Sequence, residues 1–396
     1  MSGRGRELAF VVQRYGTDVA GGSETLARLL AERLAAEGPI TVFTTCARDY
    51  VSWRNELPEG TAAAGPVTVR RFAVEEERDL EAFNRFAERL YGLPHTDDEE
   101  RVWLRRQGPY VPELVRALRE DHDRFQAVVF FTYLYYPTCE GLRAAPGRSL
   151  LVPTCHDEPP LRFRLYDDVF ARPRAFAFLT AAEERLVRGR FELGTRPALV
   201  AGLGVDEGPA PDLEAFRARH GVRGRYVAYA GRIDAGKGCA EMLAHFGRFR
   251  RERGPEVELL LMGRLALAAP LGAGVRYLGY LPDEDKRAAL AGADVVLCPS
   301  PYESLSIVLL EAFALGRPAL VNGRSPVLLD HARQAGGGLF YEDGDEFVEA
   351  LALLLGDGGL REAMGGQGRL YVREHYRWEA VLDRYRSLIA AASGAP

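Results

Sequence analysis

The feature of this sequence that most constrains its fold is the alternation of short apolar runs with longer amphipathic segments. Leu8–Gln13 is an apolar run that predicts a strand, and Ser23–Ala36 has the periodicity of a helix. Gly38-Pro39 would end that helix, and Ile40–Thr45 predicts the next strand. Apolar strands separated by helices are typical of parallel sheets covered on both faces. The chain is therefore expected to be an α/β protein that begins with a βαβ unit.

The alternation continues along the whole chain. Further strands are predicted at Val67–Phe72, Ala127–Thr132, Leu150–Thr154, Ala175–Leu179, Ala198–Ala201, Tyr226–Ala230, Glu258–Met262, Val275–Leu278, Asp294–Cys298 and Ala319–Val321. Helices are predicted over Asp79–Gly92, Glu99–Asp121 (interrupted by Pro109 and Pro112), Cys239–Arg253, Asp283–Ala291, Leu305–Leu315, Pro326–Ala332, Leu360–Glu374 and Trp378–Ala391. This order predicts two doubly wound, Rossmann-like domains.

A change in composition separates the two halves. Residues 204–224 are rich in Gly, Pro and charged residues, which is typical of a linker. We therefore divide the chain into an N-terminal domain over residues 1–206 and a C-terminal domain over residues 207–375, followed by a terminal helix over residues 376–396. A length of 396 residues agrees with this division, because domains hold roughly 150 residues each.

Charge and cysteine usage exclude some classes of protein. The formal net charge of −5 provides no chain-wide basic field of the kind that holds a phosphate backbone, so no nucleic-acid partner is expected. The five cysteines are widely spaced and contain no C-x-x-C pair, which indicates neither a disulfide framework nor a zinc site. We expect a cytoplasmic protein without a membrane span, and peripheral contact with the inner membrane face stays open.

The turn after the predicted strand Tyr226–Ala230 has the composition of a diphosphate site. Its sequence is Gly231-Arg232-Ile233-Asp234-Ala235-Gly236-Lys237-Gly238. The glycines allow close backbone approach, a helix begins next, and Arg232 and Lys237 add two positive charges. The spacing also satisfies G-x-x-x-x-G-K of a P-loop, but that motif needs Ser or Thr next, to bind magnesium, where this chain has Gly238. The alternative is a glycine-rich surface turn with solvated charges.

Lysine is rare in this chain, so its presence at position 237 favours a specific role for that residue. Of the 51 basic side chains, only Lys237 and Lys286 are lysines. Lys286 follows three acidic residues at a helix start and is expected to be solvated.

A second unusual turn follows Asp294–Cys298 and leads into an apolar helix. Glu303 lies just before this helix, next to Ser304, and can accept hydrogen bonds from a polyol such as a sugar. Glu311 is the one charged residue within the helix, and a buried carboxylate requires hydrogen-bond donors. Its partner is expected to be a protein cation or ligand hydroxyls. For Glu303, a role as a helix cap is the alternative.

Two turns in the N-terminal half carry weaker signals. Gly21-Gly22 precedes the first helix and would let a phosphate approach backbone N–H groups. The G-x-G-x-x-G fingerprint of dinucleotide enzymes is not present there, which disfavours hydride transfer. The other turn contains His156-Asp157-Glu158, where the imidazole could orient a substrate hydroxyl and a carboxylate could hold an acceptor. A satisfied structural histidine is the alternative reading.

Taken in order, these segments resemble the retaining, nucleotide-sugar-dependent glycosyltransferases of the GT-B fold, family 4 (glycosyl transferases group 1). The resemblance covers nearly the whole chain. Its motifs are Gly21-Gly22, His156-Asp157-Glu158-Pro159, Gly204-Val205-Asp206, Gly231-Arg232 with Lys237-Gly238, Gly279-Tyr280-Leu281-Pro282, the Glu303/Glu311 pair and Trp378 in the terminal helix.

The resemblance implies a donor site on the C-terminal domain, facing an acceptor-binding N-terminal domain across a cleft. Arg232 and Lys237 would hold the donor diphosphate and stabilise the departing nucleotide, without a metal or another cofactor. Glu303 would bind donor-sugar hydroxyls, Glu311 the ribose, and His156 the transferred sugar. Residues of the same turns complete the implied donor site: Gly21, Gly22, Gly231, Gly279, Tyr280, Leu281, Ser304, Leu305 and Ser306. Asp157 and Glu158 would contact the acceptor, and the terminal helix would cross back to the first domain.

The resemblance further implies a hexosyltransferase of polysaccharide or glycoconjugate biosynthesis that transfers a sugar from an NDP-sugar to an acceptor hydroxyl with retention. Front-face transfer, in which the leaving phosphate helps deprotonate the acceptor, is the expected mechanism. The sequence departs from the family at Leu305 and Ser306, where an aromatic residue and a glycine are common, and at Gly263-Arg264-Leu265, where Gly-x-Gly is frequent. A sugar-nucleotide epimerase of the same fold and a non-catalytic nucleotide-binding protein are the alternatives.

Overall fold

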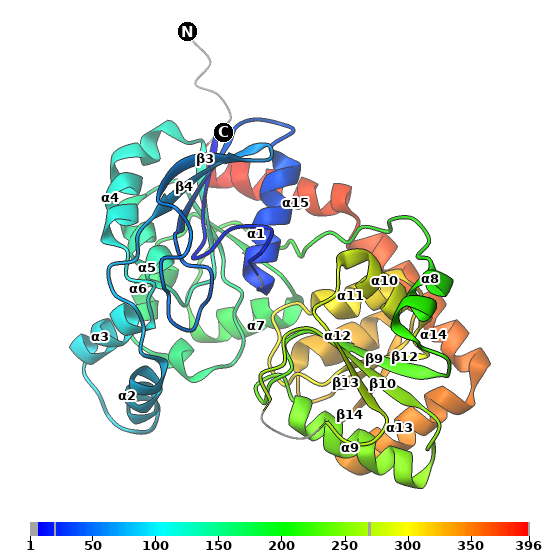
Figure 1. The fold of residues 1–396 in the computed structure, drawn as a ribbon. Coiled ribbons are helices and arrows are strands. Elements are labelled where there is room, and N and C mark those ends of the chain that lie inside the picture. Colours follow the sequence, from blue (N-terminus) through cyan, green and yellow to red (C-terminus); the bar gives the residue numbers. More distant parts are fainter. Residues whose placement is uncertain (1–6, 20, 268–270, 395–396) are drawn as a thin grey trace. The chain divides into compact units, whose positions relative to one another are not determined.

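The computed structural model describes residues 7–19, 21–267 and 271–394. They form two compact units (Figure 1). The first unit holds the described residues up to Leu203 together with the segment that begins at Leu382, and the second unit is Gly204–Val381. The sequence analysis divides the chain after residues 206 and 375 instead.

The first unit is built on an eight-stranded sheet. Its strands are β1 (Leu8–Val11), β2 (Ile40–Thr45), β3 (Gly60–Ala64), β4 (Val67–Phe72), β5 (Ala127–Phe131), β6 (Ser149–Val152), β7 (Ala175–Phe178) and β8 (Ala198–Val200). They lie in the order β3-β4-β2-β1-β5-β6-β7-β8, and β3 pairs antiparallel to β4 while the other neighbours are parallel. The strand order reverses between β1 and β5, which is where open α/β sheets bind ligands.

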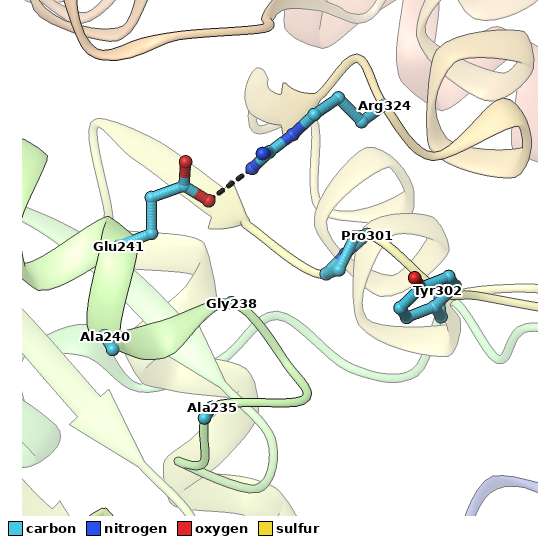
Figure 2. Close-up of a pocket in the computed structure, with 7 residues that line it drawn as sticks. All are labelled: Ala235, Gly238, Ala240, Glu241, Pro301, Tyr302 and Arg324. Carbon is cyan, nitrogen blue, oxygen red and sulfur yellow. Dashed lines mark hydrogen bonds and ion pairs between the residues drawn. The ribbon is translucent and has the colours of Figure 1, made fainter. Parts of the chain in front are cut away.

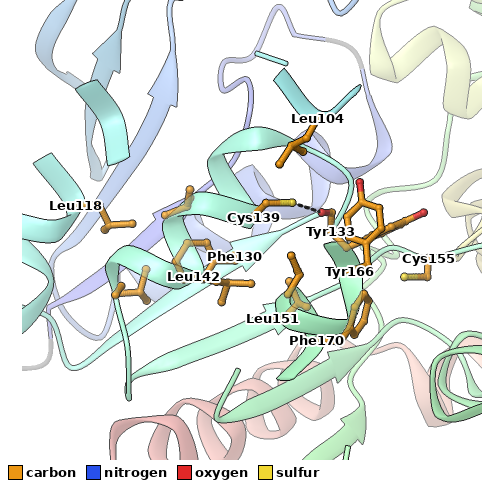
Figure 3. Close-up of a cluster of buried hydrophobic side chains, with 14 of the residues drawn as sticks. Leu104, Leu118, Phe130, Tyr133, Cys139, Leu142, Leu151, Cys155, Tyr166 and Phe170 are labelled. Atoms are coloured by element: carbon orange, nitrogen blue, oxygen red, sulfur yellow. Dashed lines mark hydrogen bonds between the residues drawn. The ribbon is translucent and has the colours of Figure 1, made fainter. Parts of the chain in front are cut away.

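Helices cover this sheet and bury its apolar side chains. They are α1 (Gly22–Leu34), α2 (Leu80–Gly92), α3 (Asp97–Gln107), α4 (Pro112–Asp121), α5 (Tyr136–Ala144), α6 (Leu165–Ala171) and α7 (Ala181–Arg190), with short 3₁₀ turns at His122–Arg124 and Pro159–Arg162. Figure 3 shows one layer of this core, in which Phe130 of β5 and Leu151 of β6 lie among side chains of α5 and α6. The Cys139 thiol there donates to the carbonyl oxygen of Tyr133. This packing fixes the carboxyl ends of β5 and β6.

The second unit has six parallel strands. They are β9 (Tyr226–Ala230), β10 (Glu258–Met262), β11 (Val275–Gly279), β12 (Val295–Cys298), β13 (Ala319–Asn322) and β14 (Gly338–Tyr341). The order is β11-β10-β9-β12-β13-β14, which is the 3-2-1-4-5-6 order of a Rossmann sheet. The order therefore reverses between β9 and β12.

Both faces of the second sheet are covered. The helices are α8 (Leu213–His220), α9 (Cys239–Glu252), α10 (Asp283–Gly292), α11 (Ile307–Ala314), α12 (Pro326–Ala335), α13 (Gly344–Gly356) and α14 (Gly358–His375). Helices α9 and α13 pack on one face in a single core cluster with β9, β10 and β12, as Figure 1 also shows. Because both faces are buried, β9 and β12 are apolar throughout, which explains their clear sequence signal.

Two motifs of the resemblance meet at the start of the last helix, α15 (Trp378–Ser393). A side chain at Gly204 would place its Cβ 2.3 Å from the Trp378 ring, so the close packing requires glycine. The backbone N–H of Val205 donates to the carbonyl oxygen of Tyr376 at 2.8 Å. Further along α15, Tyr385 Oη donates to the carbonyl oxygen of Gly202, within the first unit. The helix thus contributes residues to both units.

The predicted fold class, two doubly wound Rossmann-like domains, is confirmed. The prediction of one linker over residues 204–224 was wrong in part, because Leu213–His220 forms α8. Only Phe216 of that helix is buried, so it shows no apolar stripe in the sequence.

Two properties of the described residues bear on the class of protein. All five cysteines are buried as free thiols. Within the described ranges, none of the helices combines the length and apolar character needed to cross a bilayer.

Candidate functional site

The glycine-rich turn lies at the reversal point of the second sheet. Residues 231–238 follow β9, and the turn after β12 begins at Pro299, so the two turns leave the carboxyl ends of neighbouring strands. This is the position at which Rossmann sheets bind nucleotides. The structure therefore brings together the two strongest candidate segments of the sequence.

Hydrogen bonds hold the glycine-rich turn in place. Tyr229 Oη donates to the carbonyl oxygen of Arg232 at 2.6 Å, and the Gly231 N–H donates to the carbonyl oxygen of Met262 at 2.9 Å. Asp234 Oδ1 accepts from the backbone N–H of Lys237 at 2.8 Å. These bonds fix the turn from inside. The Arg232 side chain is 44% exposed, and its Nε lies 3.5 Å from Asp234 Oδ2.

Gly238 has no room for a side chain. Its φ of +71° is in the left-handed region, and an added Cβ would lie 2.3 Å from the carbonyl oxygen of Pro299. Gly238 is also the N-cap of α9, whose first N–H groups point into the turn. A P-loop needs Ser or Thr at this position, so the backbone of this turn disfavours the P-loop alternative.

Lys237 and Glu303 form an ion pair across the two turns. Lys237 Nζ donates to Glu303 Oε1 at 2.7 Å, and the two side chains are 28% and 17% exposed. An ammonium has three donors, so Lys237 can contact a phosphate while it holds Glu303. The resemblance implies that Lys237 binds the diphosphate and Glu303 the sugar hydroxyls. In the structure the two side chains are direct neighbours.

The turn after β12 is also braced. Asn322 Nδ2 donates to the carbonyl oxygen of Pro299 at 2.9 Å, and Ser300 Oγ donates to that of Tyr302 at 2.8 Å. Ser306, the N-cap of α11, has a left-handed backbone with φ of +64° and makes no side-chain capping bond. A non-glycine residue in this region costs about 1–2 kcal/mol. This explains why glycine is common at this position in the resembling family.

His331 braces the turn after β12 through a hydrogen bond to its backbone, a role that could not be predicted from the sequence. Its Nε2–H donates to the carbonyl oxygen of Leu305 at 3.1 Å, and its Nδ1 accepts from Tyr371 Oη at 3.0 Å. Burial lowers the pKa of His331 to about 4, so the imidazole is neutral in the folded chain.

The shifted pKa of His331 makes a prediction for acid stability. An unfolded histidine titrates near 6.5. Stability from this group is therefore complete above about pH 6.5 and is lost as the pH falls toward 4. We expect His331 alone to contribute a loss of about 2 kcal/mol of folding stability between pH 7 and pH 5. Urea unfolding at both pH values checks this. The free energy of unfolding of His331→Gln should lack the pH-dependent loss due to His331, whereas His375→Gln, at an exposed histidine, should retain it.

Glu311 is paired with the second lysine of the chain. Lys286 Nζ, in the first turn of α10, donates to Glu311 Oε1 at 2.9 Å. The expectation that Lys286 is solvated was wrong, because its partner lies on another helix, α11, and the local sequence does not show that the two helices meet. The expected protein cation for Glu311 is therefore present. Glu311 Oε2 is buried and has no hydrogen-bond partner.

Gly279, Tyr280 and Leu281 link β11 to α10. Gly279 has φ of +75°, and its carbonyl oxygen accepts from the N–H of Gly263 at 2.8 Å. Tyr280 is 77% exposed, whereas Leu281 is buried. Gly263 in turn approaches Gly231 so closely that a Cβ would lie 2.0 Å from the Gly231 carbonyl oxygen. Gly263 therefore contacts both the glycine-rich turn and Gly279.

A pocket of about 400 Å³ opens beside these turns (Figure 2). Its lining combines small residues of the glycine-rich turn and α9 with Pro301 and the exposed Tyr302. Arg324 and Glu241 form an ion pair at its edge. The pocket lining therefore includes an aromatic ring and a charged pair.

In the first unit, Gly21 and Gly22 stand at the start of α1, but a carboxylate already lies there. A Cβ on Gly21 would be 2.1 Å from Glu24 Oε2, whereas Gly22 has open space. Glu24 is buried and accepts from Arg14 Nη2 at 2.5 Å and from Gln13 Nε2 at 2.8 Å. The sequence pattern alone does not indicate this buried cluster. Of the two glycines, Gly22 leaves room for a ligand.

His156 belongs to a polar chain at the end of β6. Its Nε2 is 3.4 Å from Glu158 Oε2, and Tyr133 Oη donates to Glu158 Oε1 at 2.8 Å. Asp157 instead pairs with Arg162 at 3.1 Å on the surface. The structure therefore joins Glu158 to His156 and separates Asp157 from both.

The backbone before His156 is held by a second buried carboxylate. Glu183 accepts from the N–H groups of Cys155 and Leu179, each at 2.6 Å. Burial raises the pKa of Glu183 to about 8, and the backbone N–H bonds act in the opposite direction. Thr154, just before, has φ of +53°, a strained value for a β-branched residue. Strain of this kind clusters at functional sites.

Part of the second unit matches a sequence-family model. Residues 213–371 match the model of the family described as "Glycosyl transferases group 1". The chain is also similar to MMP alpha-(1->4)-mannosyltransferase of Mycolicibacterium hassiacum, with 31% identity over 194 residues, which is 46% of this chain and 45% of that protein. The chain thus matches about half the length of this relative.

Solved structures resemble the chain over almost its whole length. Sucrose-phosphate synthase from Thermosynechococcus elongatus has a TM-score of 0.73 at 19% identity, over 98% of this chain and 100% of that one. HepE of Anabaena, in complex with UDP and glucose, has a TM-score of 0.69 at 13% identity, over 98% and 100% of the two chains. The fold class is the GT-B fold of two Rossmann-like domains.

Proposed function

We propose that this protein is a glycosyltransferase that transfers a hexosyl group from an NDP-sugar to an acceptor hydroxyl, with retention of the anomeric configuration and without a metal ion. The observation that carries the proposal is the Lys237–Glu303 ion pair at the reversal point of the second sheet. One pair offers a cation for the diphosphate and a carboxylate for the sugar. The family match of residues 213–371 supports the same activity.

The leaving group is the first requirement of such a reaction. When the bond between the anomeric carbon and the diphosphate oxygen breaks, its electron pair stays on the diphosphate. Lys237, Arg232 and the N-terminal N–H groups of α9 surround one turn and would stabilise that charge. HepE, a protein with the same fold, was solved in complex with UDP and glucose, which supports a nucleoside diphosphate as the class of ligand.

The sugar would be held by carboxylates. Glu303, already oriented by Lys237, would accept hydrogen bonds from donor-sugar hydroxyls. In front-face transfer the acceptor oxygen bonds to the anomeric carbon on the side that the diphosphate leaves, and the hydroxyl proton passes to a diphosphate oxygen. The name of the mannosyltransferase relative records an α-linkage, and retention from an α-linked donor would give such a product.

In the first unit, His156 would contact the transferred sugar, with Glu158 as the group that orients its ring. The contact of Glu158 with both His156 and Tyr133 supports this division of roles. Asp157, exposed and paired with Arg162, would contribute least to an acceptor site. The proposed acceptor is a hydroxyl of a glycan, a lipid-linked sugar or a small molecule. The proposed role is biosynthetic and cytoplasmic, and peripheral contact with the inner membrane face stays open.

The proposal is tested by ligand binding followed by turnover. UDP-, GDP-, ADP- and dTDP-sugars are screened for a rise in melting temperature, and the best donor is incubated with and without candidate acceptors. Acceptor-dependent release of NDP, with the donor's anomeric configuration kept in the product by NMR, is the expected result. An altered sugar on an intact nucleotide would identify an epimerase, and binding without consumption would identify a non-catalytic nucleotide-binding protein.

Metal independence has its own test. Because protein cations would neutralise the diphosphate, EDTA is expected to leave turnover nearly unchanged. Loss of activity in EDTA that magnesium restores would contradict this part of the proposal.

A further inference from the structure

Both lysines of the chain pair with the two candidate donor-site glutamates. Lys237 contacts Glu303, and Lys286 contacts Glu311, at 2.7 and 2.9 Å. All the other basic side chains, out of 51, are arginines. Arginine is thus the default cation of this protein, and lysine occurs where a cation meets one of these two carboxylates.

Lys286 lies in a setting that favours a fixed ion pair. Its side chain is 28% exposed and that of Glu311 is 24% exposed. Burial alone would lower the pKa of Lys286, but the Glu311 carboxylate outweighs this and raises it above its ordinary value. Its other acidic neighbour, Asp283, is 3.7 Å away and 94% exposed, so it competes weakly. Tyr280 is a further group that acts on the ammonium.

The two oxygens of Glu311 have different surroundings. Oε1 accepts from Lys286, whereas Oε2 is buried and has no hydrogen-bond partner. A buried carboxylate oxygen without a donor is costly, and a hydroxyl that donated to it would remove that cost. The carboxylate is therefore half satisfied by the protein.

A compact ammonium fits this division better than a guanidinium. Arginine tends to take both oxygens of a carboxylate through its planar fork, whereas lysine acts as a point charge on one of them. An arginine at position 286 would therefore compete for Oε2. Lysine leaves that oxygen as an acceptor.

We propose that Lys286 is a positioning residue for nucleotide recognition, which holds Glu311 through Oε1 so that Oε2 accepts hydrogen bonds from the vicinal hydroxyls of the ribose. This inference rests on the proposed function, because it takes a nucleoside diphosphate as the ligand. Lys286 itself does not contact the reacting atoms.

The test compares ribose recognition with diphosphate recognition. UDP, GDP and ADP are titrated by calorimetry against the full chain, and the best ligand is compared with its 2′-deoxy and 3′-deoxy forms. We expect the wild type to bind the ribonucleotide about tenfold more tightly than the deoxy forms, the usual effect of losing one hydrogen bond to a charged group. In Lys286→Met this preference should fall to less than about threefold, and Lys286→Arg should lose it too, despite its charge.

Two control variants separate a specific effect from a general one. Asp283→Asn removes the exposed neighbour of Lys286 and should keep the full preference for ribose. Lys237→Met should weaken all the diphosphates together and leave the preference unchanged. A folded Lys286→Met protein with an intact ribose preference would overturn the inference but not the proposed function. If the wild type bound dTDP but none of UDP, GDP and ADP, only the inference would fall. If it bound none of the four, both would fall together.

Discussion

Replacing Lys237 by alanine is expected to lower kcat/KM by about 10²-fold, the usual effect of removing one group that stabilises developing charge. The loss of charge at the diphosphate is one reason for this effect, and the structure gives a second. Glu303 Oε1 accepts from Lys237 at 2.7 Å, so the variant also leaves a carboxylate that is 17% exposed without its cation. Steady-state kinetics with the best donor measures the effect.

Variants at neighbouring positions show which part of the loss comes from charge. Arg232→Ala should lower activity to a similar extent, because Arg232 stands in the same turn. Lys237→Arg keeps the charge but replaces a compact ammonium with a planar fork, so we expect it to recover only part of the activity. Arg248→Ala, at an exposed cation of α9, is the control and should be silent. Near wild-type turnover in both Lys237→Ala and Arg232→Ala would refute the assignment of the donor site.

Sequence periodicity was enough to predict most of the fold, for a physical reason. Strands buried on both faces are apolar at every position, and β9 and β10 were predicted with their observed ends. Two of the missed elements have no apolar face. β3, with the sequence GTAAA, is almost wholly exposed at the sheet edge, and α8 buries only Phe216. Neither leaves a pattern that local reasoning can detect.

The candidate site could be located from the sequence, but its internal pairing could not. Turns at strand ends point to the site because topology brings those ends together. Which charges meet depends on distances between helices: Lys286 reaches Glu311 across 25 positions of sequence, and Lys237 reaches Glu303 across 66. Locally, Lys286 stands beside acidic residues of its own helix and looks solvated.

The roles of buried side chains that brace the site also could not be predicted from the sequence. His331 is an ordinary residue of α12 by its pattern, and only the fold places its imidazole against the carbonyl oxygen of Leu305. Glu24 is similar, since a glutamate in the first turn of a helix is usually solvated, yet here it is buried against Arg14. These roles follow from packing alone.

Gly238→Ser is the second change with a large expected effect. It completes the G-x-x-x-x-G-K-S sequence motif of a P-loop. If the turn were a P-loop, serine would supply the missing magnesium ligand and strengthen nucleotide binding. The structure predicts the opposite. The left-handed φ of +71° disfavours any side chain, and the Cβ would lie 2.3 Å from the Pro299 carbonyl oxygen. We expect a loss of about 3 kcal/mol in stability.

The loss of function should exceed the loss of stability. A shift of Gly238 moves Lys237 and the first N–H groups of α9, so NDP binding should weaken at least tenfold in the folded fraction, with or without magnesium. Gly236→Ala is the matched control, because it lies two residues away and its Cβ would meet only Asp234 Oδ1, at an ordinary 3.4 Å. Thermal melts and NDP titrations of both variants check this. Magnesium-dependent gain of nucleotide binding in Gly238→Ser would show that this turn works as a P-loop after all, because steric exclusion and metal recruitment predict opposite signs for the same substitution.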